Sequence, residues 1–193
     1  MNLTSFFIYC IVVSFTPGPS NIVILTSVGQ VGTRKTMEYV WGATVAFGLL
    51  LAASALLNHV LAEVLPGILK VMQILGSVYM IYLAYQVYKM GATEKASQQV
   101  TGFVNGLIMQ FVNPKVVLFT FTVIPSYVLP YYDSAMSTFL FVIIITIISF
   151  LAYSSWAVFG SVFRTLLNRH QKAVSILMAL FLLYSAIMVS GII

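Results

Sequence analysis

The chain has 193 residues, of which 61% are hydrophobic and only 7% are charged, with a formal net charge of +5. Soluble domains carry roughly a quarter of their residues as charged side chains, so the composition excludes a water-soluble protein and predicts an integral membrane protein. The basic residues are scattered through short connectors, which argues against nucleic-acid binding, and the single cysteine, Cys10, excludes an intramolecular disulfide or a CxxC redox pair.

Six apolar stretches are long enough to cross a bilayer as helices, which takes about 20 residues. The N-terminus has neither a basic segment nor a small-residue cleavage site, so the first stretch is interpreted as a retained helix rather than a signal peptide. The sequence therefore predicts one all-α membrane domain over residues 1–193. The expected spans are Leu3–Val28, Tyr39–Leu61, Pro66–Tyr88, Phe103–Leu129, Met136–Phe163 and Ala173–Ile192.

The first stretch is interrupted by SFTPGPSN, residues 14–21. Proline lacks an N–H group and blocks a helical hydrogen bond, and a freed backbone group in hydrocarbon costs several kcal/mol unless it finds a partner. We therefore expect Pro17, Gly18 and Pro19 to expose carbonyls and half-helix ends to a polar cavity, with Thr16 and Asn21 beside them. Ser20 is expected to satisfy its own helix. The alternative is a simple proline kink, which is common in membrane helices.

Glu38 lies at the start of the second expected helix. An acid at a helix N-terminus is favourable in its own right, and the alternative is that Glu38 faces an inner vestibule and takes part in proton coupling. The other acids, Glu63, Glu94 and Asp133, fall in connectors or at span ends. A proton relay through the middle of the membrane therefore lacks its usual carboxylate.

The fourth stretch carries a second interruption, MQFVNPKVVLF, at Asn113 and Pro114. Lys115 follows directly, deep in an apolar span, where an ammonium group costs about 2.5–3.5 kcal/mol. We expect Lys115 either to meet a substrate carboxylate or to cap a neighbouring carbonyl. Asn21 and Asn113 can each donate and accept hydrogen bonds, either to a substrate or to the broken backbone.

The two halves of the chain contain an internal repeat, about 1–90 and 103–193, joined by a polar linker at about 89–102. Phe15-Thr16-Pro17 aligns with Val112-Asn113-Pro114, and the third stretch aligns with the sixth. Three spans per half would place the second half upside down relative to the first. The sequence thus predicts six transmembrane helices as a 3+3 inverted repeat with broken first and fourth helices, a pattern typical of secondary transporters with a site near the midplane.

Basic residues gather in the first, third and fifth connectors, so the positive-inside rule places these in the cytoplasm and both termini on the extracytoplasmic side. Gly102 and Gly106 would allow helices to approach closely, within one chain or in a homodimer. Trp156 and Tyr153 are expected as interface anchors or cavity-lining residues. Metal-ligand spacing and a Ser/His/Asp set at one depth are both missing, so we expect no metal, no tightly bound cofactor and no enzyme.

TPGPSN in the first stretch and QFVNPK in the fourth resemble the LysE/RhtB family of amino-acid exporters, and the similarity extends over essentially the whole chain. The segment QFVNPKVVLFTFTVIPSYVLP is most similar to the branch that exports cysteine and O-acetylserine. The resemblance implies proton-coupled export of small amino acids or derivatives across a bacterial inner membrane. The motif positions that carry over are Pro17, Gly18, Pro19, Asn21, Asn113, Pro114 and Lys115.

We therefore predict a secondary transporter that exports small zwitterionic amino acids by alternating access. Its lipid-embedded substrate site is expected to comprise Thr16, Pro17, Gly18, Pro19, Asn21, Asn113, Pro114 and Lys115. A pocket of this kind suits almost any small zwitterion, so the substrate stays open, as does import instead of export. A channel for small solutes, and a membrane-embedded enzyme or assembly protein, are the alternatives.

Overall fold

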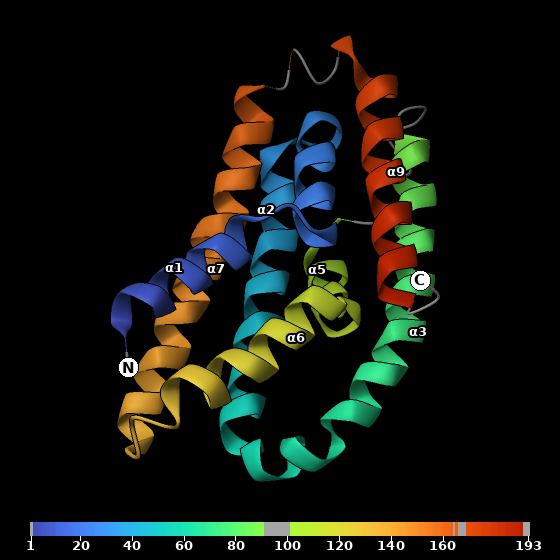
Figure 1. Cartoon of the computed structure of the whole chain (residues 1–193). Helices are drawn as coiled ribbons and strands as arrows, with labels where there is room; N and C mark the ends of the chain where they lie inside the picture. The colour runs from blue at the N-terminus through green and yellow to red at the C-terminus, as the bar shows by residue number, and fades with distance from the viewer. Residues whose placement is uncertain (1, 91–100, 164, 166–168, 191–193) are drawn as a thin grey trace.

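A computed structural model describes residues 2–90, 101–163, 165 and 169–190, and all regular secondary structure in this part is helical (Figure 1). Most of the expected linker, residues 91–100, lies outside the described residues. The helices are α1 (Leu3–Phe15), α2 (Pro19–Leu56), α3 (Asn58–Met90), α5 (Phe103–Val112), α6 (Pro114–Val123), the π-helical η1 (Ile124–Val128), α7 (Ala135–Val162) and α9 (Gln171–Ser190).

Three of the described helices, α2, α7 and α9, are long and apolar enough to cross a membrane. A fourth span is formed if α5 and the following helix from Pro114 to Val128, bent by 69° relative to each other, are taken together. α1 is a shorter apolar helix. The expectation of an all-α membrane protein with a broken fourth span is therefore confirmed.

α2 contains the second part of the first expected span and most of the second span. At Gly32 the backbone leaves the helical region, with φ 81° and ψ 166°, and the chain turns back on itself (Figure 1). Only glycine adopts this conformation readily, so the expected connector Gly29–Glu38 is reduced to a turn within α2. Similarly, α3 begins at Asn58, so Leu57 alone separates α2 from α3 and the expected connector Asn58–Leu65 is helical.

α2 forms the centre of the molecule, with α5 and α7 packed along it, whereas α3 packs along α9 (Figure 1). Two glycines permit the crossing of α2 and α5. A Cβ atom added at Gly42 would lie 1.9 Å from the carbonyl oxygen of Phe103, and one added at Gly106 would lie 2.1 Å from that of Tyr39. Gly106 therefore lets two helices of one chain approach closely. At Gly102, where φ is +99°, an added Cβ atom would have no described heavy atom within 4 Å.

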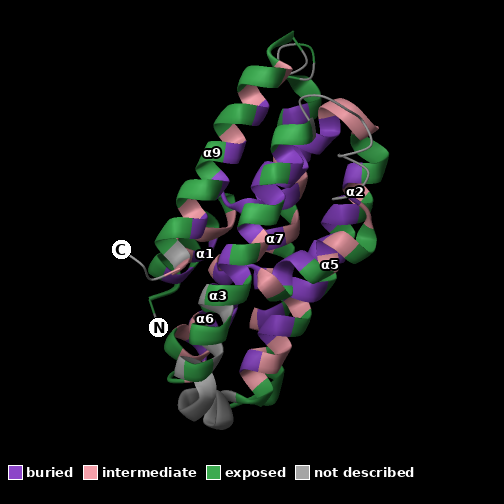
Figure 2. Cartoon of the chain, turned by 90° about the vertical axis from the view of Figure 1, so that its right-hand side faces the viewer, coloured by how far each residue is buried: buried purple, intermediate pink, exposed green. Residues whose placement is uncertain are grey.

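The outer faces of α3, α7 and α9 are exposed and apolar (Figure 2). Val78, Val162 and Leu177 are 62%, 70% and 61% exposed. In water such faces would cause aggregation, whereas in a bilayer they contact acyl chains, because a transmembrane helix already satisfies its own backbone. The buried surface is concentrated on α2 and on the helices that touch it, and the two interruptions lie there.

Candidate functional site

The first break separates α1 from α2 by three residues, Thr16, Pro17 and Gly18. Gly18 is the N-cap of α2, with extended backbone and no side-chain hydrogen bond to the first turn. The side chain of Asn21 spans the gap: Nδ2 donates to the carbonyl oxygens of Thr16 at 2.9 Å and Ser14 at 3.4 Å. Asn21 thus satisfies carbonyls that the end of α1 would otherwise leave free.

The second break is a single residue, Asn113, between α5 and α6. Its Oδ1 accepts a hydrogen bond from the backbone N–H of Lys115 at 3.1 Å, and its carbonyl oxygen accepts from Val116 and Val117 at 3.0 Å each. Pro114 is the first residue of α6, where the lack of an N–H group costs nothing. The second break therefore caps its own helix.

Pro17, which the sequence pairs with Pro114, does not hold the same helical position as Pro114. Pro19 and Pro114 each occupy the first position after an N-cap, Gly18 and Asn113 respectively. Proline is favoured at this helical position because its φ is already suitable. Pro19 therefore holds the same helical position as Pro114, and Pro17 lies outside the helix.

The two breaks touch each other through Lys115. Its Nζ donates a hydrogen bond of 2.6 Å to the carbonyl oxygen of Thr16, 99 residues earlier in the chain. The aliphatic part of the side chain lies against Gly18, where an added Cβ would be 3.1 Å from Lys115 Cδ. Lys115 therefore caps a carbonyl of the first break in this conformation, and the absence of a side chain at Gly18 leaves room for it.

A buried hydrogen-bond network extends this contact. Ser20 Oγ accepts from Gln110 Nε2 at 3.0 Å and from Asn113 Nδ2 at 3.2 Å, and the Tyr153 hydroxyl donates to Gln110 Oε1 at 3.0 Å. Ser20 thus bonds across the molecule instead of satisfying its own helix, contrary to expectation. In a low-dielectric interior such bonds are strong, so the network holds both breaks against α7.

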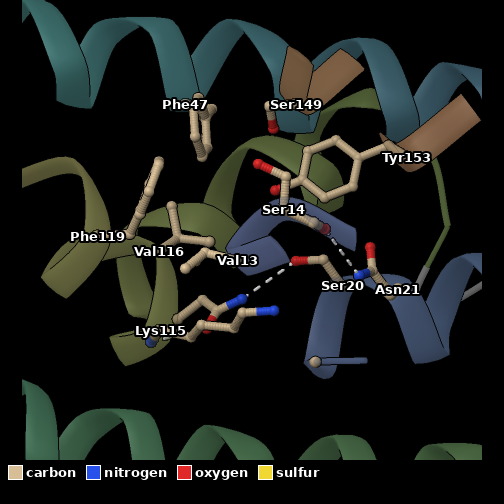
Figure 3. Close-up of a pocket in the computed structure, with 12 residues that line it drawn as sticks. Val13, Ser14, Ser20, Asn21, Phe47, Lys115, Val116, Phe119, Ser149 and Tyr153 are labelled. Carbon is tan, nitrogen blue, oxygen red and sulfur yellow. Dashed lines mark hydrogen bonds between the residues drawn. The ribbon is translucent and has the colours of Figure 1, made fainter. Parts of the chain in front are cut away.

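The breaks enclose a hollow of about 20 Å³ between α1, α2, α6 and α7 (Figure 3), which is room for about one water molecule. Two buried oxygens on its wall, Ser14 Oγ and Asn21 Oδ1, have no hydrogen-bond partner within the described part of the chain. Leaving such an oxygen unpaired costs about 1–3 kcal/mol. Both atoms are therefore acceptors available to a bound ammonium group or to water.

The same hollow is electropositive on another side. The first N–H groups of α2 have no intrahelical acceptor and Gly18 has no side chain to cap them, so the positive end of the helix dipole is open. Lys115 is the charged side chain on the wall. Together these groups form an arrangement that favours a carboxylate.

The structure brings together the predicted residues of both breaks, whereas Glu38 is exposed on α2 and lines neither this hollow nor the other cavity beside the breaks. Sequence reasoning did not select Gln110, although a buried amide three residues before Asn113 was a usable signal. Phe47 and Ser149 also line the hollow, and nothing in their local sequence distinguishes them from packing residues. Trp156, considered a cavity or interface residue, donates from Nε1 to the carbonyl oxygen of Phe15 at 3.2 Å.

A family model described as LysE type translocator matches residues 11–190. The chain belongs to this family. Proteins named cysteine/O-acetylserine efflux protein are similar over nearly the full length. The protein of Salmonella paratyphi A is 27% identical over 97% of this chain and 96% of its own, and that of Klebsiella pneumoniae is 29% identical over 96% and 95%. No solved structure matches the chain. The resemblance to the LysE family and to its cysteine/O-acetylserine branch is thus confirmed, and the chain is a multi-pass membrane protein of a translocator family.

Proposed function

We propose that the protein is a secondary transporter that exports small zwitterionic amino acids or their derivatives from the cytoplasm by alternating access. One observation carries the proposal: two helix breaks far apart in sequence meet around a buried polar hollow, with Lys115 between them. Irregular backbone persists at membrane depth only where protein or a polar cavity satisfies it. In a translocator family, discontinuous helices of this kind typically form the substrate site.

The groups around the hollow match both ends of a zwitterion. Lys115 and the open first turn of α2 suit a carboxylate, whereas the unpaired oxygens of Ser14 and Asn21 suit an ammonium group. The remaining predicted site residues would act mainly through the backbone, by keeping the two breaks open and apposed. These residues are Thr16, Pro17, Gly18, Pro19, Asn113 and Pro114.

The hollow must widen before an amino acid can enter, because it has room for about one water molecule. The hydrogen bond between Lys115 and Thr16 holds the two breaks together. A carboxylate is a stronger acceptor than a carbonyl for an ammonium donor, so a substrate would draw Lys115 away from Thr16. Substrate binding would then loosen the contact between the breaks, which gives the substrate a preference between two conformations, as alternating access requires.

The helix pairing supports the six-span inverted repeat that the proposal includes. α1 packs on α7, just as α5 packs on α2, while α2 pairs with α7 and α3 pairs with α9. In the proposed repeat, α1 corresponds to α5, the second part of α2 to α7, and α3 to α9. Exchanging the two halves then turns the α1–α7 pair into the α5–α2 pair and leaves the α2–α7 and α3–α9 pairs unchanged. We propose that the parts of α2 before and after Gly32 belong to the first and second spans, with both termini on the extracytoplasmic side of a bacterial inner membrane.

The names of the relatives suggest the first substrates to test. Because the similar proteins are named for efflux of cysteine and O-acetylserine, we propose small neutral amino acids of this kind as the cargo. Proton-gradient coupling is proposed on the same family basis. Glu38, exposed close to the turn at Gly32, stays the candidate coupling residue at the proposed cytoplasmic face.

Overexpression followed by a screen of amino acids at growth-inhibitory concentrations tests the function. Cells should tolerate higher concentrations of the exported compound, and everted membrane vesicles should take it up with saturation and counterflow. A Lys115→Met variant expressed at the same level should do neither. Single-channel currents without counterflow would favour a pore, and unchanged tolerance to every small amino acid would contradict export.

A further inference from the structure

A second cavity adjoins the breaks on the side of α3 and α9, and its volume is about 320 Å³. This lies near the lower end of the range for small-molecule sites, roughly 300–1,000 Å³, whereas the central hollow measures about 20 Å³. One part of its wall is formed by the breaks. The part opposite is formed by side chains of α3, α6 and α9, most of which also reach the exposed surface: Met80, Leu118, Phe181, Tyr184, Ser185 and Met188.

The two spaces share a wall, because Gly18, Asn113 and Lys115 line both of them. Gly18 contributes no side chain there, and the chain of Lys115 lies over it with Cδ at 3.1 Å from the position of a Cβ. If Lys115 turned away from Thr16, the way from the central hollow to the second cavity would open beside Gly18. A ligand held between the breaks could then extend toward α9.

The part of the cavity wall on α9 carries neutral side chains, both polar and polarizable. Tyr184, Ser185 and Met188 bring a hydroxyl, a hydroxymethyl group and a thioether to the cavity, and among the described residues that line it Lys115 is the one charged side chain. A cationic side chain would find no carboxylate there and would be repelled by Lys115, at a high cost in a low-dielectric space. A neutral side chain of a few heavy atoms loses no charged hydration and can pack against the thioether and the aromatic ring.

We propose that this cavity is the side-chain subsite of the transporter and that Tyr184, Ser185 and Met188 of α9 determine its specificity. The inference rests on the proposed function: the ammonium and carboxylate groups occupy the central hollow, and the side chain passes Gly18 to reach α9. Neutral amino acids are selected by size, and lysine is rejected.

α9 is a suitable place for specificity residues because its position does not depend on the cavity wall. It packs along α3, and Ser77 Oγ on α3 donates a hydrogen bond of 3.0 Å to the carbonyl oxygen of Ala186. Side chains on the cavity wall can therefore change while the α3–α9 pair stays in place.

The test compares uptake of labelled O-acetylserine and labelled serine into everted vesicles. Ser185→Phe should narrow the cavity and lower the ratio of O-acetylserine to serine uptake about tenfold or more. Met188→Ala should widen it and raise the uptake of labelled methionine relative to serine. Leu183→Phe and Ile187→Ala are matched controls, since both residues lie on α9 outside the cavity wall, and both should keep the wild-type ratios.

Unchanged ratios in both cavity variants, with uptake retained, would overturn the inference and would mean that this wall faces lipid acyl chains. If Ser185→Phe fails to accumulate in the membrane, Met188→Ala decides alone. Failure of the proposed function gives a different result, because the wild-type protein would then take up none of the three amino acids.

Discussion

The two breaks differ in how they satisfy the backbone groups that an interrupted helix leaves without a partner. The first is three residues long, leaves the start of α2 uncapped, and relies on the side chains of Asn21 and Lys115 to satisfy its carbonyls. The second is a single residue, Asn113, which caps α6 with its own side chain. The first break therefore presents the uncapped start of α2 and the Thr16 carbonyl, and the second break contributes the Lys115 side chain that binds this carbonyl.

This asymmetry assigns different roles to equivalent positions. With Pro19 matched to Pro114, Ser20 and Lys115 both occupy the second position of a half-helix. Ser20 accepts two hydrogen bonds in the buried network, whereas Lys115 reaches the first break as a donor. Two half-helices that both begin with proline thus carry unlike second residues, and the proposed site needs such a difference to recognise the two unlike ends of an amino acid.

Removing the charge that joins the breaks should have the largest effect. Lys115→Met should reduce transport by roughly 100-fold or more, since a charge-assisted hydrogen bond and the partner of a carboxylate are lost together. Vesicle uptake at matched expression measures it. Lys172→Met, an exposed residue at the start of α9, is the control and should retain wild-type transport. Equal transport by both variants would remove Lys115 from the mechanism.

The network beside the breaks should contribute mainly to stability. Gln110 is fully buried and bonds to Ser20 and Tyr153, so Gln110→Leu removes hydrogen bonds to α2 and α7 at once, although Ser20 Oγ still accepts from Asn113 Nδ2. It should lower the free energy of unfolding by about 2–4 kcal/mol. Tyr153→Phe removes one bond of the same network and should cost about 1 kcal/mol. Thermal unfolding of the purified proteins ranks them, and a reversed order would show that the network is not centred on Gln110.

A matched pair of asparagine variants tests the difference between the breaks directly. Asn113 caps α6 as an acceptor through Oδ1, whereas Asn21 bridges the first break as a donor through Nδ2. Asn113→Asp keeps the capping acceptor and loses only the Nδ2 donation to Ser20, whose Oγ still accepts from Gln110, so it should cost about 1 kcal/mol. Asn21→Asp loses the donor and should cost about 1–3 kcal/mol. Equal losses in melting temperature would mean that the two breaks are held together in the same way.

The smallest effect is expected at Glu38. Because this side chain is exposed, Glu38→Gln should leave the melting temperature unchanged. If Glu38 takes part in coupling, the variant should transport down a concentration gradient at the wild-type rate but lose its acceleration by an imposed pH gradient. A flux that responds to the pH gradient as in the wild type would exclude Glu38 from coupling.

The parts of this molecule that could be predicted from sequence are those with a local cause. The prolines at 17, 19 and 114 favour an interruption of the helix, and an ammonium at position 115 deep in an apolar stretch must find a partner. The partner itself, the carbonyl of Thr16, depends on how distant helices cross. The crossing of α2 and α5 depends on Gly42 and Gly106, where the two backbones approach too closely for a Cβ atom. The local sequence around these glycines gives no indication of which helix each will contact.

The same limit applies to register and to the cavity walls. The sequence alone pairs Pro17 with Pro114. In the structure, Pro19 and Pro114 are the prolines that directly follow a helix N-cap, Gly18 and Asn113 respectively. The wall formed by Tyr184, Ser185 and Met188 lies on a helix that reads as an ordinary apolar span. Only the placement of α9 beside the breaks gives these side chains a possible role.

The most direct test of the central claim, that the two breaks together bind the substrate, uses a thiol in the hollow. Ser14→Cys, in a Cys10→Ser background, places a nearly isosteric sulfhydryl where Ser14 Oγ has no hydrogen-bond partner among the described residues, and N-ethylmaleimide reports its accessibility. Saturating O-acetylserine should slow the labelling when Lys115 is present and should have no effect in the Lys115→Met variant. Labelling that O-acetylserine does not slow, or slows equally in both proteins, would contradict the account.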